Sequence, residues 1–293
     1  MSQIERVFFS VDGDRVVGDL HLPEGAGLFP GVIVGGPMTS VKEQVTGVYA
    51  RALAERGFAA LALDHRNFGE SEGAPRQYEN YHLKIEDLRA AIDVLADHPA
   101  VNSGRLGAAG ICLGAGYVLH AAVQDTRIRA AGTVVGYFRD VPAMCAADPE
   151  GFQAKVDQGI EARLHYESTG EVLTVPAAAL SGDAAMTLQS TYDYYATPRA
   201  GVPNYTNAFA VMSREHFLTF DVQSVAPDLN IPLVMVHSEN GLSPKWARAF
   251  NENLRIQAPL HWLDGPNQTA FYDDPDLVSK ATLLLATHLE TNL

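Results

Sequence analysis

The sequence lacks the features that define several large classes of protein. It has no cluster of lysine or arginine, only two cysteines, and no apolar run near the ~20 residues that a membrane-spanning helix needs. With 35 acidic and 21 basic side chains among 293 residues, its formal charge is −14. Because phosphate contacts need concentrated positive charge, this composition excludes a nucleic-acid-binding protein.

The two cysteines, Cys112 and Cys145, cannot form a disulfide framework, and no Cys/His cluster has the spacing of a zinc site. The first residues, MSQIERVFFS, lack the pattern of a signal peptide. We therefore expect a cytoplasmic enzyme or binding protein that takes a small molecule, contacts neither membrane nor nucleic acid, and needs no metal or cofactor. A homo-oligomer remains open.

The apolar pattern predicts an α/β protein. Apolar residues alternate at positions 7, 9 and 11, and a turn at 12–14 precedes a second apolar stretch at 16–22, which predicts a hairpin. Short unbroken apolar runs follow, typical of parallel strands buried on both faces, at residues 31–34, 59–63, 106–111, 130–138, 232–236 and 260–263. Amphipathic helices are predicted between them at 45–56, 84–96, 113–124, 244–253 and 276–289. This alternation favours a doubly wound, mostly parallel sheet.

One long segment, residues 139–230, interrupts the alternation. It is rich in Pro, Gly, Ala and tyrosine, and a connection of this length inside an α/β domain indicates an insertion with helices of its own. We expect residues 1–138 and 231–293 to form the core domain and residues 139–230 to form a helical cap, or lid, near the carboxyl ends of the strands. The alternative is an ordinary helical subdomain.

The strongest motif is Gly-Ile-Cys-Leu-Gly at residues 110–114, between a predicted strand and a helix. It has the form of a nucleophile elbow, in which a sharp turn between two glycines exposes the nucleophile, here Cys112. The amino end of the following helix would lower the pKa of this thiol. The alternative is a small buried cysteine beside a glycine-rich turn. We expect Cys145, inside the insertion, to be such a buried residue.

Three motifs together resemble the α/β-hydrolase superfamily: Gly-Gly-Pro-Met at 35–38, Asp-His-Arg-Asn-Phe-Gly-Glu-Ser at 64–71, and the elbow. Within it the chain is similar to dienelactone-hydrolase-like and X-Pro-peptidase-like proteins, several of which have cysteine at the elbow. The resemblance implies an α/β-hydrolase fold with an inserted helical cap. It also implies an oxyanion hole formed by the backbone N–H groups of Met38 and Leu113, although residues 35–37 would also suit a simple chain reversal.

The sequence departs from this family where the catalytic acid and histidine are expected. Asn240 stands at the usual aspartate position, with Glu239 the only nearby carboxylate, and Gln268 stands at the usual histidine position. Glutamine can neither accept the proton of a thiol nor return one to a leaving group. The conventional triad is therefore incomplete.

Three other residues are candidate bases or substrate contacts. Dienelactone hydrolases have a glutamate near the thiol in a comparable region, so the resemblance makes Glu43 a candidate catalytic residue; alternatively, it stabilises the first turn of a helix. His65 follows a strand at its carboxyl end, where it would face the same crevice, but turn histidines are often structural. His216, in the insertion, would reach down from a lid or remain solvated.

Three functions fit these observations. The first is a cysteine-dependent hydrolase or acyl-transfer enzyme acting on an ester, lactone or thioester. The second is a non-hydrolytic cyclase, lyase or isomerase of secondary metabolism on the same scaffold, because an oxyanion hole can stabilise an enolate without a histidine. The third is a small-molecule binding protein without catalytic activity.

Overall fold

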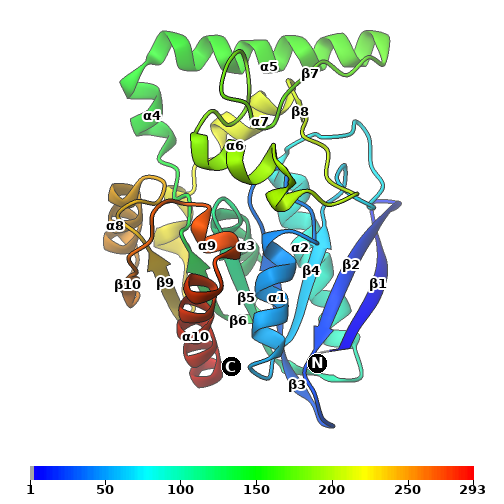
Figure 1. Cartoon of the computed structure of the whole chain (residues 1–293), viewed down its shortest axis with the longest axis vertical. Coiled ribbons are helices and arrows are strands. Elements are labelled where there is room, and N and C mark those ends of the chain that lie inside the picture. Colours follow the sequence, from blue (N-terminus) through cyan, green and yellow to red (C-terminus); the bar gives the residue numbers. More distant parts are fainter. Residues whose placement is uncertain (1–2) are drawn as a thin grey trace.

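The computed structural model describes residues 3–293, and its centre is an eight-stranded sheet (Figure 1). Strands β1 and β2 form the antiparallel edge, β2 also pairs antiparallel with β4, and the remaining neighbours are parallel. In spatial order the strands are β1 (Gln3–Val11), β2 (Asp14–Leu22), β4 (Ala59–Asp64), β3 (Phe29–Gly35), β5 (Val101–Ile111), β6 (Ile128–Val134), β9 (Leu233–His237) and β10 (Leu260–Trp262). The predicted mostly parallel α/β sheet is confirmed.

The predicted hairpin also forms, with Val11 opposite Asp14. Its two turn residues, Asp12 and Gly13, both have positive φ, at 51° and 93°. This is the condition for a type I′ turn, whose twist matches that of the strands. The local sequence therefore fixes the edge of the sheet.

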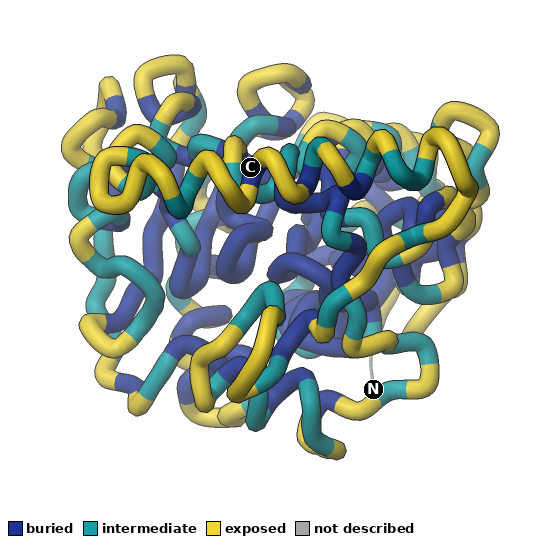
Figure 2. The backbone as a smooth tube through the Cα atoms, turned by 90° about the horizontal axis from the view of Figure 1, so that it is seen from above, coloured by how far each residue is buried: buried dark blue, intermediate teal, exposed yellow. Residues whose placement is uncertain are grey.

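Helices cover both faces of the sheet. On one face α1 packs against α10, and on the other α2 packs against α3 (Figure 1). Figure 2 shows that buried residues occupy the centre of the molecule and exposed ones its outer turns. The helices of the core, taken over both faces, are α1 (Val45–Ala54), α2 (Tyr81–Asp97), α3 (Gly114–Gln124), α8 (Pro244–Asn253), α9 (Ala270–Asp273) and α10 (Pro275–Asn292).

One strand ends earlier than predicted. The apolar run at 130–138 predicted a single strand, but β6 ends at Val134 and Val135 has a φ of 40°. This turn takes the chain off the sheet at its carboxyl end, although the Val135 N–H still donates to Val236 at 2.8 Å. Residues 136–139 therefore lie above the sheet edge, where they can line a site.

The segment 139–230 has its own elements, and none of its described residues joins the eight-stranded sheet. Figure 1 shows most of this segment grouped beyond one end of the sheet. Its elements are α4 (Val141–Ala147), α5 (Pro149–Thr169), β7 (Thr174–Val175), α6 (Gln189–Tyr195), a 3₁₀ turn at Pro198–Ala200, β8 (Phe209–Ala210), α7 (Ser213–Thr219) and a second 3₁₀ turn at Gln223–Asp228. Its status as a separate cap domain remains a prediction. Within residues 3–293, every helix is too short or too polar to cross a membrane.

Candidate active site

The elbow motif forms a strained turn between β5 and α3. Cys112 has a φ of 56°, a left-handed conformation that costs of order 1–3 kcal/mol for a residue other than glycine. Three backbone hydrogen bonds hold it: its N–H donates to Val134 at 3.1 Å, and its carbonyl accepts from Ala115 at 3.1 Å and Tyr137 at 2.9 Å. The fold thus holds the sulfur at the end of the central strand.

Both glycines of the elbow are required by close packing. A Cβ on Gly114 would lie 2.3 Å from the carbonyl oxygen of Gly35, and one on Gly110 would lie 2.6 Å from the Cα of Ala115. Neither backbone contact can yield without moving a strand or a helix. The glycine spacing in the motif is therefore a consequence of the packing of β3, β5 and α3.

A cavity of about 270 Å³ opens above Cys112. The core contributes its floor, and the segment 139–230 contributes a large part of its walls. Most of the lining is apolar or aromatic, and it comprises Pro37, Met38, Cys112, Leu113, Tyr137, Arg139, Met144, Ala185, Met186, Thr187, Leu188, Thr191, Tyr195, Phe217, Leu218, Leu242 and Tyr272. Its composition and size suit a small organic ligand.

The two predicted oxyanion residues, Met38 and Leu113, lie beside Cys112 in this lining. The Leu113 N–H donates to the Cys112 sulfur, and no protein oxygen in residues 3–293 accepts from the N–H of Met38. Glu79, which is 1% exposed, accepts the next backbone N–H, that of Thr39, at 2.8 Å. The Met38 N–H therefore has no protein acceptor, the Leu113 N–H points to the sulfur at which an oxyanion would form, and the loop that carries Met38 is anchored through Thr39.

The Cys112 sulfur is buried and hydrogen-bonded to the side chains of Tyr272 and Gln268. Burial raises the pKa of the Cys112 thiol, and the hydrogen bonds from Tyr272, the Leu113 N–H and Gln268 only partly oppose it. The expectation that the helix terminus would lower this pKa is wrong, because desolvation of the thiolate outweighs it. The resting form at neutral pH is the thiol.

This raised pKa predicts how alkylation of Cys112 depends on pH. In a Cys145→Ser background, the rate of reaction with iodoacetamide should rise ~10-fold per pH unit between pH 7 and 9, because only the thiolate reacts. The background is needed because Cys145, expected to be buried, is only half-buried and would also react. Mass spectrometry of the labelled protein gives the rate. A plateau below pH 8 would contradict the assignment of a neutral thiol.

Positions 240 and 268, where the family has its catalytic acid and histidine, carry side chains that bond to the backbone, and the nearby carboxylate of Glu239 does not face Cys112. Gln268, 2% exposed, donates to the Val135 carbonyl at 2.7 Å and accepts from the Leu242 N–H at 2.9 Å. Asn240 donates to the Gly265 carbonyl at 2.9 Å. Glu239 forms an ion pair with Arg248, and both side chains are largely exposed. The carboxylate of Glu239 is thus directed to the surface.

The two candidate histidines lie outside the cavity lining. His65 is buried, with its Nδ1 3.1 Å from Asp87, and burial lowers its pKa despite that carboxylate. His216 packs among the rings of Tyr78, Tyr81 and His82. Neither imidazole is brought to Cys112, and both are engaged in packing between elements.

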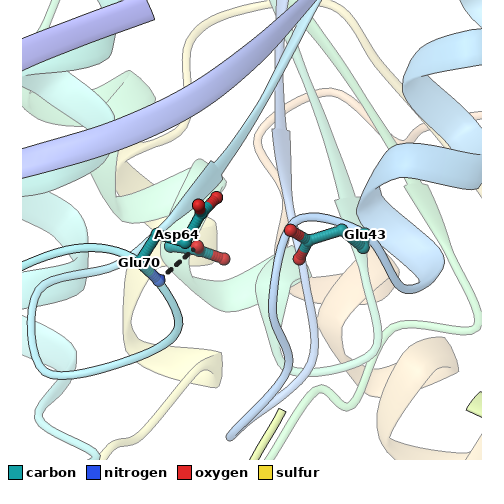
Figure 3. Close-up of side chains that lie close together, drawn as sticks. All are labelled: Glu43, Asp64 and Glu70. Atoms are coloured by element: carbon teal, nitrogen blue, oxygen red, sulfur yellow. Dashed lines mark hydrogen bonds between the residues drawn. The ribbon is translucent and has the colours of Figure 1, made fainter. Parts of the chain in front are cut away.

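Glu43 also lies outside the lining, in a cluster with Asp64 and Glu70 (Figure 3). The ammonium of Lys42 joins these three carboxylates, at 2.7 Å from Glu43, 2.8 Å from Asp64 and in contact with Glu70. Burial alone would lower the pKa of Lys42, but its hydrogen bonds to the carboxylates raise it. The cluster is therefore an ion-pair network centred on an ammonium group.

Glu43 has a further contact that links the core to the insertion. Its Oε1 accepts from the side chain of Asn204 at 2.8 Å. The structure therefore brings Cys112, Met38, Leu113 and Gln268 together, and it leaves Glu43 and Glu239 in other interactions. The catalytic role of Glu43 remains a prediction, because its carboxylate bonds to Lys42 and Asn204 and not to the Cys112 sulfur.

Three residues at or beside the site, Tyr272, Arg139 and Glu79, were not predicted from the sequence. Tyr272 lies in α9, four residues after the Gln268 position, so the segment after the last strand was the available signal. Arg139 sits at the start of the insertion, directly after an apolar run. Glu79 stands in a stretch without a motif, and only its contact with Thr39 reveals its role.

The sheet order, the elbow and the cavity above the sulfur define an α/β hydrolase. The family described as "Esterase FrsA-like" matches residues 2–146. The uncharacterized protein YcjY of Escherichia coli K12 is 32% identical over 283 residues, which cover 90% of this chain and 89% of YcjY.

Two relatives also have solved structures. PA2218 of Pseudomonas aeruginosa is 32% identical over 286 residues, which cover 91% of this chain and 75% of PA2218. Its crystal structure superposes with a TM-score of 0.84 at 27% sequence identity, covering 100% of this chain and 94% of the PA2218 chain. The polyketide transferase GrgF of a Penicillium species is 25% identical over 288 residues, covering 96% and 95%. Its structure, that of an α/β hydrolase, has a TM-score of 0.82 at 23% identity, covering 98% and 99%.

The chain belongs to the α/β-hydrolase superfamily, in one family with YcjY and PA2218. It is an enzyme of the hydrolase or acyl-transfer class.

Proposed function

We propose that the protein transfers an acyl group from a thioester through Cys112. The observation that carries this proposal is the environment of the sulfur: a strained elbow cysteine, a donating Leu113 N–H, and a cavity lined in residues 3–293 by neither a histidine nor a carboxylate. Within the superfamily, the dienelactone-hydrolase-like or X-Pro-peptidase-like branch remains the predicted placement.

The first step forms a bond between the Cys112 sulfur and the acyl carbon. The tetrahedral oxyanion accepts hydrogen bonds from the N–H groups of Leu113 and Met38. The bond between the acyl carbon and the leaving sulfur then breaks, and the proton of the Cys112 thiol leaves with that sulfur as a free thiol. In the second step an acceptor thiol or amine, which is more nucleophilic than water, takes the acyl group and its proton returns to Cys112.

A thioester fits this site better than an ester or lactone because the site has no strong general acid. A leaving thiolate, with an ordinary pKa of about 8.5, can depart without a strong general acid, and the exchange replaces one thioester by another. A leaving alkoxide is far more basic and must be protonated as it departs. Tyr272, whose pKa burial raises well above its ordinary value, stays a neutral donor that orients the sulfur.

Two further observations support transfer rather than rapid hydrolysis. Gln268 takes the place of the base that would activate water, so an acyl-enzyme should persist until a better nucleophile arrives. GrgF, which is similar over nearly its whole length, is named a polyketide transferase. The predicted cap, residues 139–230, would help by limiting the access of water to the cavity.

The same missing base favours a second candidate, a cyclase, lyase or isomerase that never forms an acyl-enzyme. In that case the N–H groups of Leu113 and Met38 would stabilise an enolate, and Cys112 would only shape the cavity. A binding protein without activity is the third candidate. These alternatives differ from the proposal in whether Cys112 becomes acylated.

Intact-protein mass spectrometry distinguishes them. Incubation with butyryl-N-acetylcysteamine should add one butyryl group to the wild type and to Cys145→Ser, and none to Cys112→Ala. The matched oxygen ester should react far more slowly. The absence of an adduct on the wild type, or its retention in Cys112→Ala, would refute acyl transfer through this cysteine.

A further inference from the structure

We infer that the acyl group taken by this cavity carries a carboxylate, which Arg139 binds. The inference rests on the proposed function for the acyl group at Cys112, and it adds the chemical class of the substrate. It comes from the position of Arg139, which lines the same cavity as Cys112 and is the only charged side chain to do so within residues 3–293.

Arg139 is fully buried, with 0% of its surface exposed, and within residues 3–293 its hydrogen-bond partners are two carbonyls and a thioether and include no carboxylate. Asp221 interacts with it only at longer range. By contrast, the other deeply buried cations have carboxylate partners: Lys42 has Asp64, and Lys84 has Glu79 at 2.6 Å. Buried charges in proteins are generally paired, so an unpaired one indicates a missing anion.

The partners that Arg139 does have leave part of the guanidinium free. One Nη donates to the carbonyl of Phe217, and the other donates to Leu218 at 3.0 Å and contacts the sulfur of Met144 at 3.8 Å. The Nε–H is buried and has no partner in the protein. A ligand oxygen can therefore still be bound by this cation.

A second polar group without a partner belongs to another residue of the cavity lining. Tyr195 lines it and is 3% exposed, and its hydroxyl is buried without a hydrogen-bond partner. An unpaired buried hydroxyl is costly, as is an unpaired N–H. Arg139 and Tyr195 thus offer two donors with no acceptor of their own, and the rest of the lining is mostly apolar. A short apolar chain that ends in a carboxylate has the matching chemistry.

Arg139 also has a structural role that must be separated from this one. Its two carbonyl partners belong to the carboxyl end of α7, where a positive charge interacts favourably with the helix dipole. Its guanidinium also lies 4.3 Å from the centre of the Phe217 ring. A residue that only holds α7 in place would affect all ligands of the cavity equally. A residue that binds the substrate carboxylate would affect only the anionic ones.

A matched pair of ligands separates the two roles. Calorimetry on the Cys112→Ala variant, which cannot be acylated, would compare succinyl-N-acetylcysteamine with its methyl ester, which lacks the charge. We expect the carboxylate to bind about 10- to 100-fold more tightly. Adding Arg139→Gln should remove this preference by weakening the binding of the carboxylate far more than that of the methyl ester, whereas Arg139→Lys should retain part of it. Arg248→Gln, an exposed change of the same charge, should preserve it.

Equal binding of the two ligands before any Arg139 substitution would overturn the inference, even if Arg139→Gln does not fold. So would an equal loss of both ligands in Arg139→Gln, since that is the behaviour of a purely structural residue. Because this binding needs no reaction, it can fail while the butyryl adduct forms on the wild type. It can equally succeed where no adduct forms, so the two proposals fail separately.

Discussion

The double variant Asn240→Asp/Gln268→His is expected to hydrolyse thioesters ~10²- to 10⁴-fold faster than the wild type, which is the usual contribution of a general base. The side chain at position 268 already contacts the Cys112 sulfur, so an imidazole there would accept its proton and later activate water. The resemblance to the superfamily places the catalytic aspartate at position 240, so we expect a carboxylate there to orient the new imidazole.

The single variants serve as controls for this gain. Asn240→Asp alone supplies no base and should not raise hydrolysis, and Gln268→His alone should give a smaller gain than the pair, because Glu239 is held by Arg248. Release of free thiol gives the rate, and intact mass shows whether the acyl-enzyme becomes shorter-lived. If the folded double variant gains nothing, the missing base is not what limits hydrolysis.

Replacement of Glu79 by alanine should lower the free energy of unfolding by about 3–5 kcal/mol, the cost of leaving one member of a buried ion pair alone. The change isolates Lys84, which is 2% exposed, and also removes the acceptor of the Tyr117 hydroxyl at 2.7 Å. It also frees the N–H of Thr39, next to Met38 in the predicted oxyanion hole. Denaturant unfolding followed by fluorescence measures the loss.

Two other substitutions give this measurement its meaning. Glu79→Gln keeps an acceptor for Thr39 but cannot neutralise Lys84, so it should also be clearly destabilising. Glu72→Ala removes a largely exposed glutamate that faces Arg15 at 3.7 Å and should change stability by no more than about 0.5 kcal/mol. Similar losses for Glu72→Ala and Glu79→Ala would mean that the buried pair contributes no more than a surface contact.

The parts of the fold that the sequence predicted are those encoded over short distances. Buried strands such as β4 appear as unbroken apolar runs, and the hairpin turn at Asp12 and Gly13 follows from residues that tolerate positive φ. The elbow was predictable for the same reason, because its two glycines and Cys112 are neighbours. Local sterics left a recognisable pattern.

The parts that could not be predicted depend on contacts between distant segments. Whether Glu43 reaches Cys112 depends on Lys42 and Asn204, which draw its carboxylate into another network. The pKa of Cys112 depends on how deeply segments distant in the sequence bury it, and this burial outweighs the effect of the neighbouring helix. Arg139 is ordinary in the sequence and becomes informative only when its burial without a carboxylate partner is known.

The cavity has two origins in the chain, and this division bears on how the enzyme could diversify. Its floor belongs to strand ends and turns whose glycines admit almost no substitution. Much of its walls, here called the roof and including Ala185 to Leu188, comes from the insertion. Descendants of a common ancestor could therefore exchange residues contributed by the insertion, and with them the molecules they accept, while inheriting the elbow and Cys112 unchanged. Laboratory libraries aimed at new specificities should be confined to the same roof.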